Sequence, residues 1–259
     1  MESAMGKTIA VANQKGGVGK TTTAVNLSAV LAEMGKKTLL VDLDPQGNAT
    51  SGLGQEAGKI SVYEVILGVA GIEQSIRKTR WDRLSLIPGD IRMAGAELEL
   101  AGFEDREHQL KKAMRSIRGN YDFIIIDCPP SLNLLTLNAL GCADSILIPI
   151  QCEYYALEGV TSLMNTIQRV RRSINPQLQI EGILLTMLDG RTNLGLQVVE
   201  QVKKHFRKQV YGVTIPRSVR LGEAPSHGEP INVYDPRSTG CAAYRALGAE
   251  FLRRNGRKD

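Results

Sequence analysis

Residues 12–23 read ANQKGGVGKTTT, and this stretch decides the fold. Its ending, G-K-T at 19–21, is that of a phosphate-binding loop, whose usual pattern is G-x-x-x-x-G-K-[ST]. Gln14 stands where that pattern has its first glycine, and a second lysine, Lys15, comes next. The stretch follows an apolar run and precedes a helical pattern, which is the context that such a loop requires. The extra lysine is the feature that the ordinary pattern does not explain.

The glycines and the lysine at the end of this loop suit a bound polyphosphate. Gly16, Gly17 and Gly19 allow the backbone to turn so that successive N–H groups face one anion. A helix that begins near Gly19 adds the partial positive charge of its N-terminus. In such loops the lysine reaches the β- and γ-phosphates and the next hydroxyl holds Mg²⁺, which assigns these roles to Lys20 and Thr21. The loop therefore predicts a nucleoside triphosphate site with Mg²⁺.

Around the loop, short apolar runs alternate with longer helical patterns. The runs lie at 8–13, 37–44, 84–89, 121–127, 145–150 and 180–188, and the helical patterns at 19–34, 91–101, 105–118, 132–141, 156–173, 193–206 and 239–254. Nearly continuous apolar runs are typical of strands buried on both faces of a parallel sheet. The alternation predicts an α/β fold, a doubly wound and mostly parallel sheet flanked by helices, of the P-loop NTPase class. We expect one ATPase domain at 6–254, a short extension at 1–5 and a basic tail at 255–259.

Aspartates stand where two of the apolar runs end. Asp42 and Asp44 occupy alternate positions of one predicted strand, so their side chains are expected to point the same way. Asp127 ends the run FIIID, in the form of a Walker B aspartate that holds Mg²⁺ through water. A single aspartate at a strand end is more often a turn or cap residue. Three carboxylates converging on a phosphate loop favour a metal-nucleotide site instead.

The bulk properties exclude several classes of protein. No run of 18 apolar residues is present, so no membrane-spanning helix is expected. The N-terminus, MESAMGKTIAV, lacks a basic segment followed by an apolar one and is not a secretory signal. The four cysteines form no C-x-x-C pair, which favours free thiols in a reducing cytoplasm.

Charge is divided unevenly along the chain. Residues 1–168 contain 16 Lys or Arg against 19 Asp or Glu, whereas residues 169–259 contain 16 against 8. A basic C-terminal third favours a polyanionic partner, either nucleic acid or anionic lipid. A solvated basic surface without a partner fits the charge alone equally well.

Six segments together resemble one known family. KGGVGKTT, VDLDPQGNATSGLG, DCPPSL, QCEYYALEG, LLTMLDGRTNLG and IPRSVRLGEAPSHGEPI are similar to segments of the ParA/Soj chromosome- and plasmid-partitioning ATPases. These belong to the deviant Walker A group of P-loop NTPases, which also contains MinD and the nitrogenase iron protein. The resemblance extends from about residue 6 to about residue 254.

The resemblance implies a role for the extra lysine. In this family the residue that matches Lys15 reaches across an ATP-sandwich homodimer to the partner's ATP, much as an arginine finger does in trans. The residue that matches Asp44 orients the attacking water, and slow intrinsic ATP hydrolysis is expected. The implied catalytic residues are Lys15, Lys20 and Asp44; the nucleotide contacts are Lys15, Gly16, Gly17, Val18, Gly19, Lys20, Thr21, Thr22, Asp44 and Pro216; the Mg²⁺ residues are Thr21, Asp42, Asp44 and Asp127.

The resemblance also implies partners. Arg191 and Arg220 match arginines that bind DNA without sequence specificity, so a nucleotide-dependent dimer on the nucleoid, in the cytoplasm, is expected. A ParB-like centromere-binding protein is expected to stimulate hydrolysis and release the dimer from DNA. The turns that contain Arg191 and Pro216 are alternatively placed to approach the adenine of the nucleotide.

Three rival interpretations stay open at this point. Residues 239–254 have apolar positions at helical spacing, which suits either a MinD-like membrane helix or, more simply, a helix packed on the core. An iron–sulfur protein of this group requires two cysteines per subunit at the dimer axis. Cys128 comes directly after Asp127, which is not the position of such a ligand. A biosynthetic ATP-dependent ligase of the same superfamily would carry a substrate motif, and none is evident.

Overall fold

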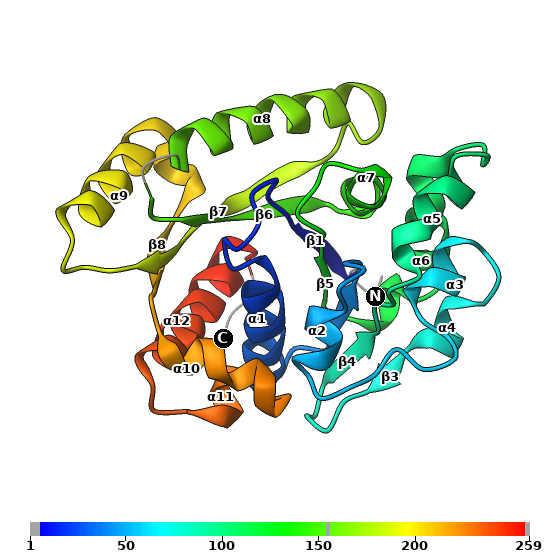
Figure 1. The fold of residues 1–259 in the computed structure, drawn as a ribbon, viewed down its shortest axis with the longest axis horizontal. Helices are drawn as coiled ribbons and strands as arrows, with labels where there is room; N and C mark the ends of the chain where they lie inside the picture. The colour runs from blue at the N-terminus through cyan, green and yellow to red at the C-terminus, as the bar shows by residue number, and fades with distance from the viewer. Residues whose placement is uncertain (1–5, 154–155, 257–259) are drawn as a thin grey trace.

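The computed structural model describes residues 6–153 and 156–256, which form a layered α/β fold around one twisted sheet (Figure 1). The strands, in the sheet order β3-β4-β2-β5-β1-β6-β7-β8, are β1 Lys7–Val11, β2 Thr38–Asp42, β3 Arg77–Lys78, β4 Leu84–Ile87, β5 Phe123–Asp127, β6 Ser145–Gln151, β7 Gln179–Leu188 and β8 Val210–Pro216. Every pairing between described strands is parallel except that of β3 with β4. The carboxyl ends of the parallel strands therefore meet at one edge of the sheet.

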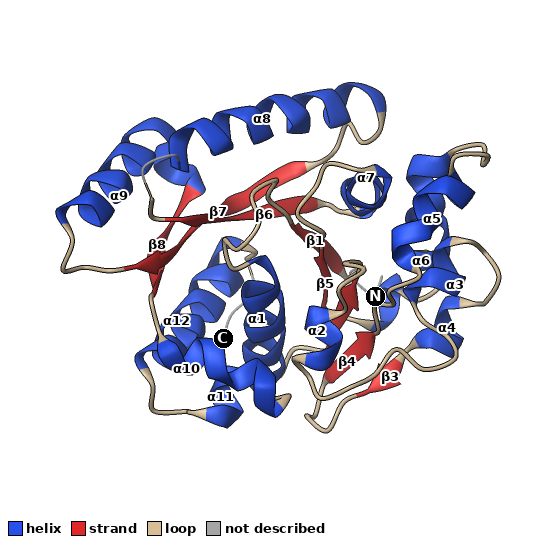
Figure 2. Cartoon of the chain, in the orientation of Figure 1, coloured by secondary structure: helices blue, strands red, loops and turns tan. Residues whose placement is uncertain are grey.

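Helices cover both faces of this sheet (Figure 2). They are α1 Lys20–Glu33, α2 Asn48–Ser51, α3 Val62–Ile66, α4 Ile72–Ser75, α5 Met93–Leu100, α6 Gln109–Met114, α7 Leu134–Cys142, α8 Ala156–Ser173, α9 Asn193–Phe206, α10 Val219–Glu223, α11 Ile231–Tyr234 and α12 Thr239–Arg254. One buried apolar cluster joins the sheet to α3–α9, and the other joins it to α1, α2 and α10–α12. This arrangement confirms the predicted doubly wound fold.

The apolar strand sequences are explained by this double burial. In β5, Ile124 and Ile126 belong to one cluster, whereas Phe123 and Ile125 belong to the other. Successive side chains of a strand point to opposite faces, so a strand covered on both sides needs apolar residues at every position. Each such fully buried side chain contributes about 1.5–3 kcal/mol of hydrophobic stabilisation.

The C-terminal helix packs on the core. Tyr244, Leu247, Phe251 and Leu252 of α12 are buried, and the Phe251 ring meets that of Phe123 edge-on at 5.1 Å between centroids. The core-packing interpretation of residues 239–254 is therefore confirmed, because the apolar face of this helix is already covered. Within the described ranges, no helix combines the length and apolar character needed to cross a bilayer.

The structure departs from the predicted elements at several places. Strands β3 and β8 and the short helices α2, α3, α4, α10 and α11 were not predicted. The helix predicted at 105–118 begins as a 3₁₀ turn, because Asp105 has a left-handed φ of 54°, and α6 ends at Met114. The expected extension at 1–5, residues 257–259 of the expected tail and residues 154–155 of the QCEYYALEG segment lie outside the described residues.

Candidate nucleotide-binding site

The loop between β1 and α1 adopts a conformation that requires two of its glycines. Gly17 and Gly19 have φ values of 72° and 85°, in the left-handed region that L side chains rarely adopt. Asn13 fixes the start of the loop by two hydrogen bonds. Its side-chain amide donates to the carbonyl of Pro149 at 2.7 Å, and its side-chain oxygen accepts from the Lys15 N–H at 3.1 Å. The loop then leads directly into α1, and no side chain caps the N-terminus of this helix at Gly19, which leaves its first N–H groups available to an anion.

Lys20 lies inside this loop. Its side chain is buried, and its ammonium donates to the carbonyl of Lys15 at 2.9 Å. Burial lowers the pKa of Lys20, while the negative charges of Asp127 and Asp44 act in the opposite direction. The hydroxyl of Thr186, on β7, donates to the carbonyl of Val18 at 2.8 Å and fixes the far side of the loop. The ammonium of Lys20 is therefore well placed to bind a phosphate group in the loop.

Lys15 lies on the outside of the same loop. Its side chain is 47% exposed and its ammonium pairs with the carboxylate of Glu153 at 3.1 Å. The two lysines of the loop KGGVGKT therefore occupy different environments, one directed into the loop and the other away from it.

Asp127 stands at the carboxyl end of β5, beside the loop. Its carboxylate is fully buried, and neither oxygen has a hydrogen-bond partner within the described residues. Burial, and next the charge of Asp42, raise the pKa of Asp127 well above its ordinary value. A buried carboxylate without partners is costly unless a cation is bound, so Asp127 fits a Mg²⁺ site.

The oxygens of Asp42, by contrast, already have partners. Oδ2 accepts from the backbone N–H and the hydroxyl of Thr50 at 2.8 and 2.7 Å, and Oδ1 accepts from the Asp44 N–H at 3.3 Å. Burial raises the pKa of Asp42 to about 6, although the hydrogen bonds from Thr50 oppose this shift. Asp42 thereby fixes the segment that follows β2.

Asp44 lies beyond the strand instead of within it. Strand β2 ends at Asp42, and the Asp44 carboxylate accepts from the N–H of Gln46 at 3.0 Å in a tight turn. The strand predicted at 37–44 therefore ends two residues early, and Asp44 stands at the start of the turn that follows it. No group of three or more His, Cys, Asp or Glu side chains in the described parts could hold a metal alone. Mg²⁺ at this site would depend on nucleotide oxygens, as it commonly does.

A cavity of about 230 Å³ opens beside the loop. It is lined by Gly19, Thr22, Thr186, Met187, Ile215, Pro216, Arg217, Ser218, Leu221, Gly222 and Tyr244. The lining brings the predicted residue Pro216 next to the phosphate loop, and its mostly apolar character suits a nucleotide base. Sequence reasoning missed Thr186, Met187 and Tyr244, although the first two stand near the carboxyl end of a predicted strand. Met187 has a φ of 52°, which is uncommon for a side chain of this kind.

The two arginines predicted to bind DNA also lie near this edge of the sheet. Arg191 follows β7, is 89% exposed and forms a two-point ion pair with Asp189. Arg220 is on α10, after β8, and pairs with Glu223 and Asp235 at 3.0 and 3.3 Å. Both guanidinium groups are accessible, and each is held by a carboxylate.

A glycine loop around a buried lysine, with a buried aspartate at a neighbouring strand end, defines the nucleotide site of a P-loop ATPase. A sequence profile described as an AAA domain matches residues 6–180. The sporulation initiation inhibitor protein Soj of Bacillus subtilis is 58% identical over 248 residues, which cover 95% of this chain and 98% of Soj. The chromosome partitioning protein ParA of Myxococcus xanthus is 53% identical over 253 residues, or 97% of this chain and 89% of that protein. The chain therefore belongs to the Soj/ParA family of chromosome-partitioning ATPases, which confirms the resemblance.

A solved structure supports the same fold. Cobyrinic acid a,c-diamide synthase from Mycobacterium smegmatis, with bound ADP and magnesium, superposes with a TM-score of 0.85 at 40% identity and covers 98% of both chains. Identity to Soj and ParA is higher, and this difference favours partitioning over the biosynthetic alternative.

Proposed function

We propose that this ATPase acts in chromosome partitioning as an ATP-driven DNA-binding switch. ATP with Mg²⁺ joins two copies through their phosphate loops, the dimer binds DNA without sequence specificity, and a ParB-like partner stimulates hydrolysis and release. The partitioning role and the ATPase activity rest on the family, and the remaining steps are argued from this chain's own residues.

The observation that carries the proposal is the placement of the two lysines. Lys20 is buried in the loop, where it can neutralise phosphate charge within its own chain. Lys15 is exposed and directed away, so its ammonium can meet an anion that approaches from outside. A cation delivered in trans to a phosphoryl group stabilises the charge that develops during transfer.

Gly16 supports an approach from outside. A Cβ atom at this position would meet no heavy atom nearer than the Cβ of Pro130 at 4.0 Å, and its φ is not left-handed. Neither packing nor backbone conformation within the chain requires glycine here. A second chain or a phosphate close to the backbone provides the reason.

The other residues of the site divide the remaining tasks. Bound Mg²⁺ would neutralise charge on the β- and γ-phosphates. Asp127 and the hydroxyl of Thr21 are the residues that would hold it, and this hydroxyl is close enough to Asp127 to lower the pKa of the carboxyl against the effect of burial. Asp44, in the turn after β2, would orient water, while Asp42 keeps that turn in place through Thr50.

DNA binding is proposed for Arg191 and Arg220. Their ion pairs are exposed, and exposed pairs contribute only about 0–1 kcal/mol, so DNA phosphates can displace the carboxylates at small cost. The positive excess of residues 169–259 adds attraction without base readout.

The first experiment is retention on random-sequence duplex DNA with ATP, with ADP and without nucleotide, over a salt series. We expect retention with ATP alone that weakens steeply as salt rises. DNA binding that does not depend on nucleotide, or no DNA binding by an active ATPase, would contradict the switch.

Variants assign the steps to residues. Lys15→Gln is expected to abolish ATP-dependent dimerisation and stimulated hydrolysis. The double variant R191E/R220E is expected to lose DNA and to keep ATP-dependent dimerisation. Arg115→Glu, a single charge reversal on an exposed arginine just after α6, is the control for charge reversal itself and should retain DNA. Dimer loss in R191E/R220E would instead assign these arginines to the nucleotide site or to folding.

A further inference from the structure

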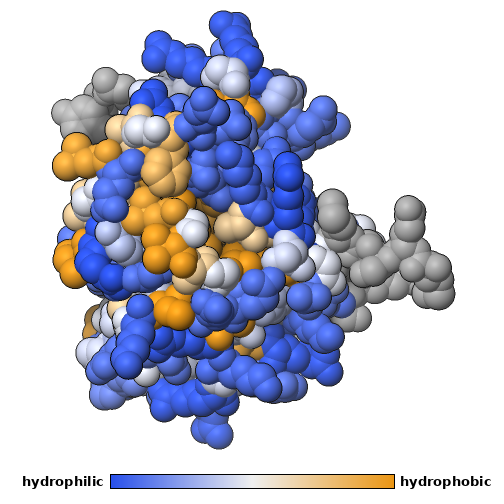
Figure 3. All heavy atoms as spheres, turned by 90° about the vertical axis from the view of Figure 1, so that its right-hand side faces the viewer, coloured by the Kyte–Doolittle hydropathy of each residue, from blue (hydrophilic) through white to orange (hydrophobic). Residues whose placement is uncertain are grey.

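Helix α5 presents an uncovered apolar stripe to solvent. Ile91 and Leu98 are 68% and 84% exposed, and Ala94 and Ala101 are exposed between and beyond them. Ala94 and Leu98 lie within α5, while Ile91 precedes its N-cap and Ala101 is its C-cap, and the spacing 91, 94, 98 and 101 places all four along one side of this segment. Figure 3 shows hydrophobic surface gathered on the side of the molecule that carries α3 to α6. These four residues are called the α5 patch below.

Acidic residues border the α5 patch. Glu97 and Glu99 lie on either side of the stripe, about 100° from Leu98 around the helix, and Glu104 and Asp105 follow its end. Residues 91–105 contain these four acidic residues and a single basic one, in a chain with a formal net charge of +5. Glu97 and Glu104 form no ion pair within the described part of the chain. A surface with this chemistry repels DNA and suits a segment that carries both apolar and basic side chains.

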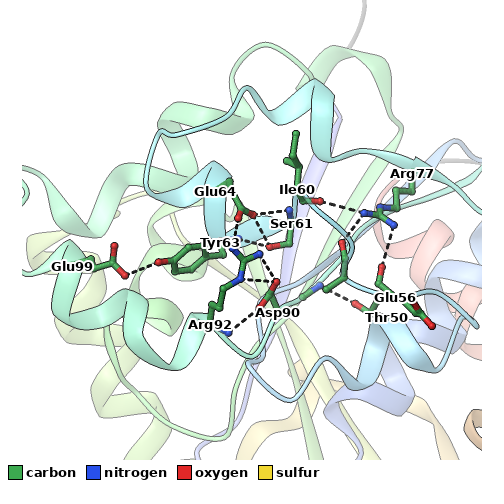
Figure 4. Close-up of polar contacts among 12 residues, drawn as sticks. Thr50, Glu56, Ile60, Ser61, Tyr63, Glu64, Arg77, Asp90, Arg92 and Glu99 are labelled. Carbon is green, nitrogen blue, oxygen red and sulfur yellow. Dashed lines mark hydrogen bonds and ion pairs between the residues drawn. The ribbon is translucent and has the colours of Figure 1, made fainter.

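The helix is held rigidly at both ends (Figure 4). Arg92 pairs with Asp90 and Glu64 at 2.5 Å each, and its guanidinium lies 4.7 Å from the centre of the Tyr63 ring. The Tyr63 hydroxyl donates to Glu99 at 2.7 Å, one turn or more further along α5. A fixed helix face loses little conformational entropy when a partner binds.

The start of α5 is connected to the nucleotide site by consecutive contacts. The Gly89 N–H donates to the Thr50 hydroxyl at 2.8 Å, and this hydroxyl donates to Asp42 at 2.7 Å. Asp42 in turn accepts from the N–H of Asp44. A Cβ on Gly89 would lie 2.8 Å from Cγ of Asp42, so the strand exit and the carboxylate are in close contact. A displacement of α5 would therefore also displace the turn that contains Asp44, through these contacts.

We propose that the α5 patch docks a basic, apolar peptide segment of a partner protein, and that docking reaches the catalytic turn through Gly89, Thr50 and Asp42. The inference rests on the proposed function, because the partner is the one that stimulates hydrolysis. The occupant follows from the surface itself, which combines exposed aliphatic side chains with a rim of carboxylates.

The experiment titrates the full-length chain, with ATP, Mg²⁺ and duplex DNA, with the ParB-family protein encoded in the same genome. Leu98→Ser should raise the concentration for half-maximal stimulation about tenfold, as loss of a central apolar anchor does. Glu97→Lys should also raise the concentration for half-maximal stimulation. Unstimulated hydrolysis and ATP-dependent DNA retention should equal those of the wild type. Leu196→Ser, on α9 at the other end of the sheet, is the matched control and should be stimulated normally.

The outcomes separate this inference from the function on which it rests. Normal stimulation of Leu98→Ser would overturn the docking surface and leave the switch intact. Loss of the ATP-dependent dimer in Leu98→Ser, measured by light scattering, would show that a second copy occupies the patch and would overturn the basic partner. A wild type that no ParB-family protein stimulates would refute both proposals. Unchanged thermal unfolding of Leu98→Ser, expected for a side chain that is 84% exposed, excludes misfolding as the cause.

Discussion

Replacing Thr50 by valine tests the link between α5 and the site most directly. Thr50 is buried, its hydroxyl donates to Asp42 and it accepts from the buried N–H of Gly89. Valine keeps the shape of threonine and replaces the hydroxyl by a methyl group, which can neither donate nor accept a hydrogen bond. The Asp42 carboxylate then loses one donor, and the Gly89 N–H loses its partner.

The cost follows from these two losses. A hydrogen bond to a charged group contributes about 1.5–3 kcal/mol, and a buried donor without a partner costs about 1–3 kcal/mol. We therefore expect Thr50→Val to lower the free energy of unfolding by roughly 3–5 kcal/mol, against a total of about 5–15 kcal/mol for a domain. Thr50→Ser retains the hydroxyl and removes one methyl group, which costs only about 1 kcal/mol.

The effect should also depend on pH. Folding raises the pKa of Asp42 from 3.8 to about 6, so the native state binds this proton more tightly than the unfolded chain does. Ionisation of Asp42 thus costs stability as pH rises from about 4 to 6. Loss of the Thr50 hydroxyl penalises the ionised form most, so the Thr50→Val deficit should be larger at pH 8 than at pH 5.

Urea unfolding of the nucleotide-free protein at both pH values measures these quantities. The assay compares Thr50→Val with Thr50→Ser and the wild type. A valine variant as stable as the serine variant at pH 8, or a deficit that grows as pH falls, would refute the reasoning.

Three further predictions concern stability and metal binding. Gly182→Ala would place a Cβ 2.4 Å from the Tyr211 ring and should cost about 1–3 kcal/mol in urea unfolding, whereas Gly119→Ala, with nothing within 4 Å, should change stability by less than about 0.5 kcal/mol. Asp127→Asn should abolish the gain in ATP affinity that Mg²⁺ provides, measured by calorimetry with and without the metal; an unchanged gain would remove Asp127 from the metal site. Burial covers all four thiols and raises the pKa of Cys128, so a thiol reagent at pH 8 should react far more slowly with the folded than with the denatured protein.

The phosphate loop and the buried strands were predictable because their causes are local. Left-handed glycines, the lysine at the start of α1 and continuous apolar runs all show in short segments of sequence. Strand β8 was missed because it is only partly buried and its sequence, VYGVTIP, mixes glycine and a polar residue with apolar ones. The partners of Asp42 could not be predicted, since Thr50 and Gly89 meet it only after three separate segments have folded together.

The ion pairs of the molecule indicate which cations can change partner. Lys15 with Glu153, and Arg191 with Asp189, are pairs in which the cation is about half exposed or more, and such pairs add about 0–1 kcal/mol. Arg92 differs, because its two carboxylate partners are only 8% and 12% exposed and its ring contact with α3 fixes it further. Breaking that cluster would leave two largely buried carboxylates with only the donors of Ser61 and the Arg92 backbone, which costs more than the loss of an exposed pair. The cations proposed to meet ATP and DNA are thus the ones that the fold holds weakly, whereas the cation at the base of α5 keeps a docking surface in place.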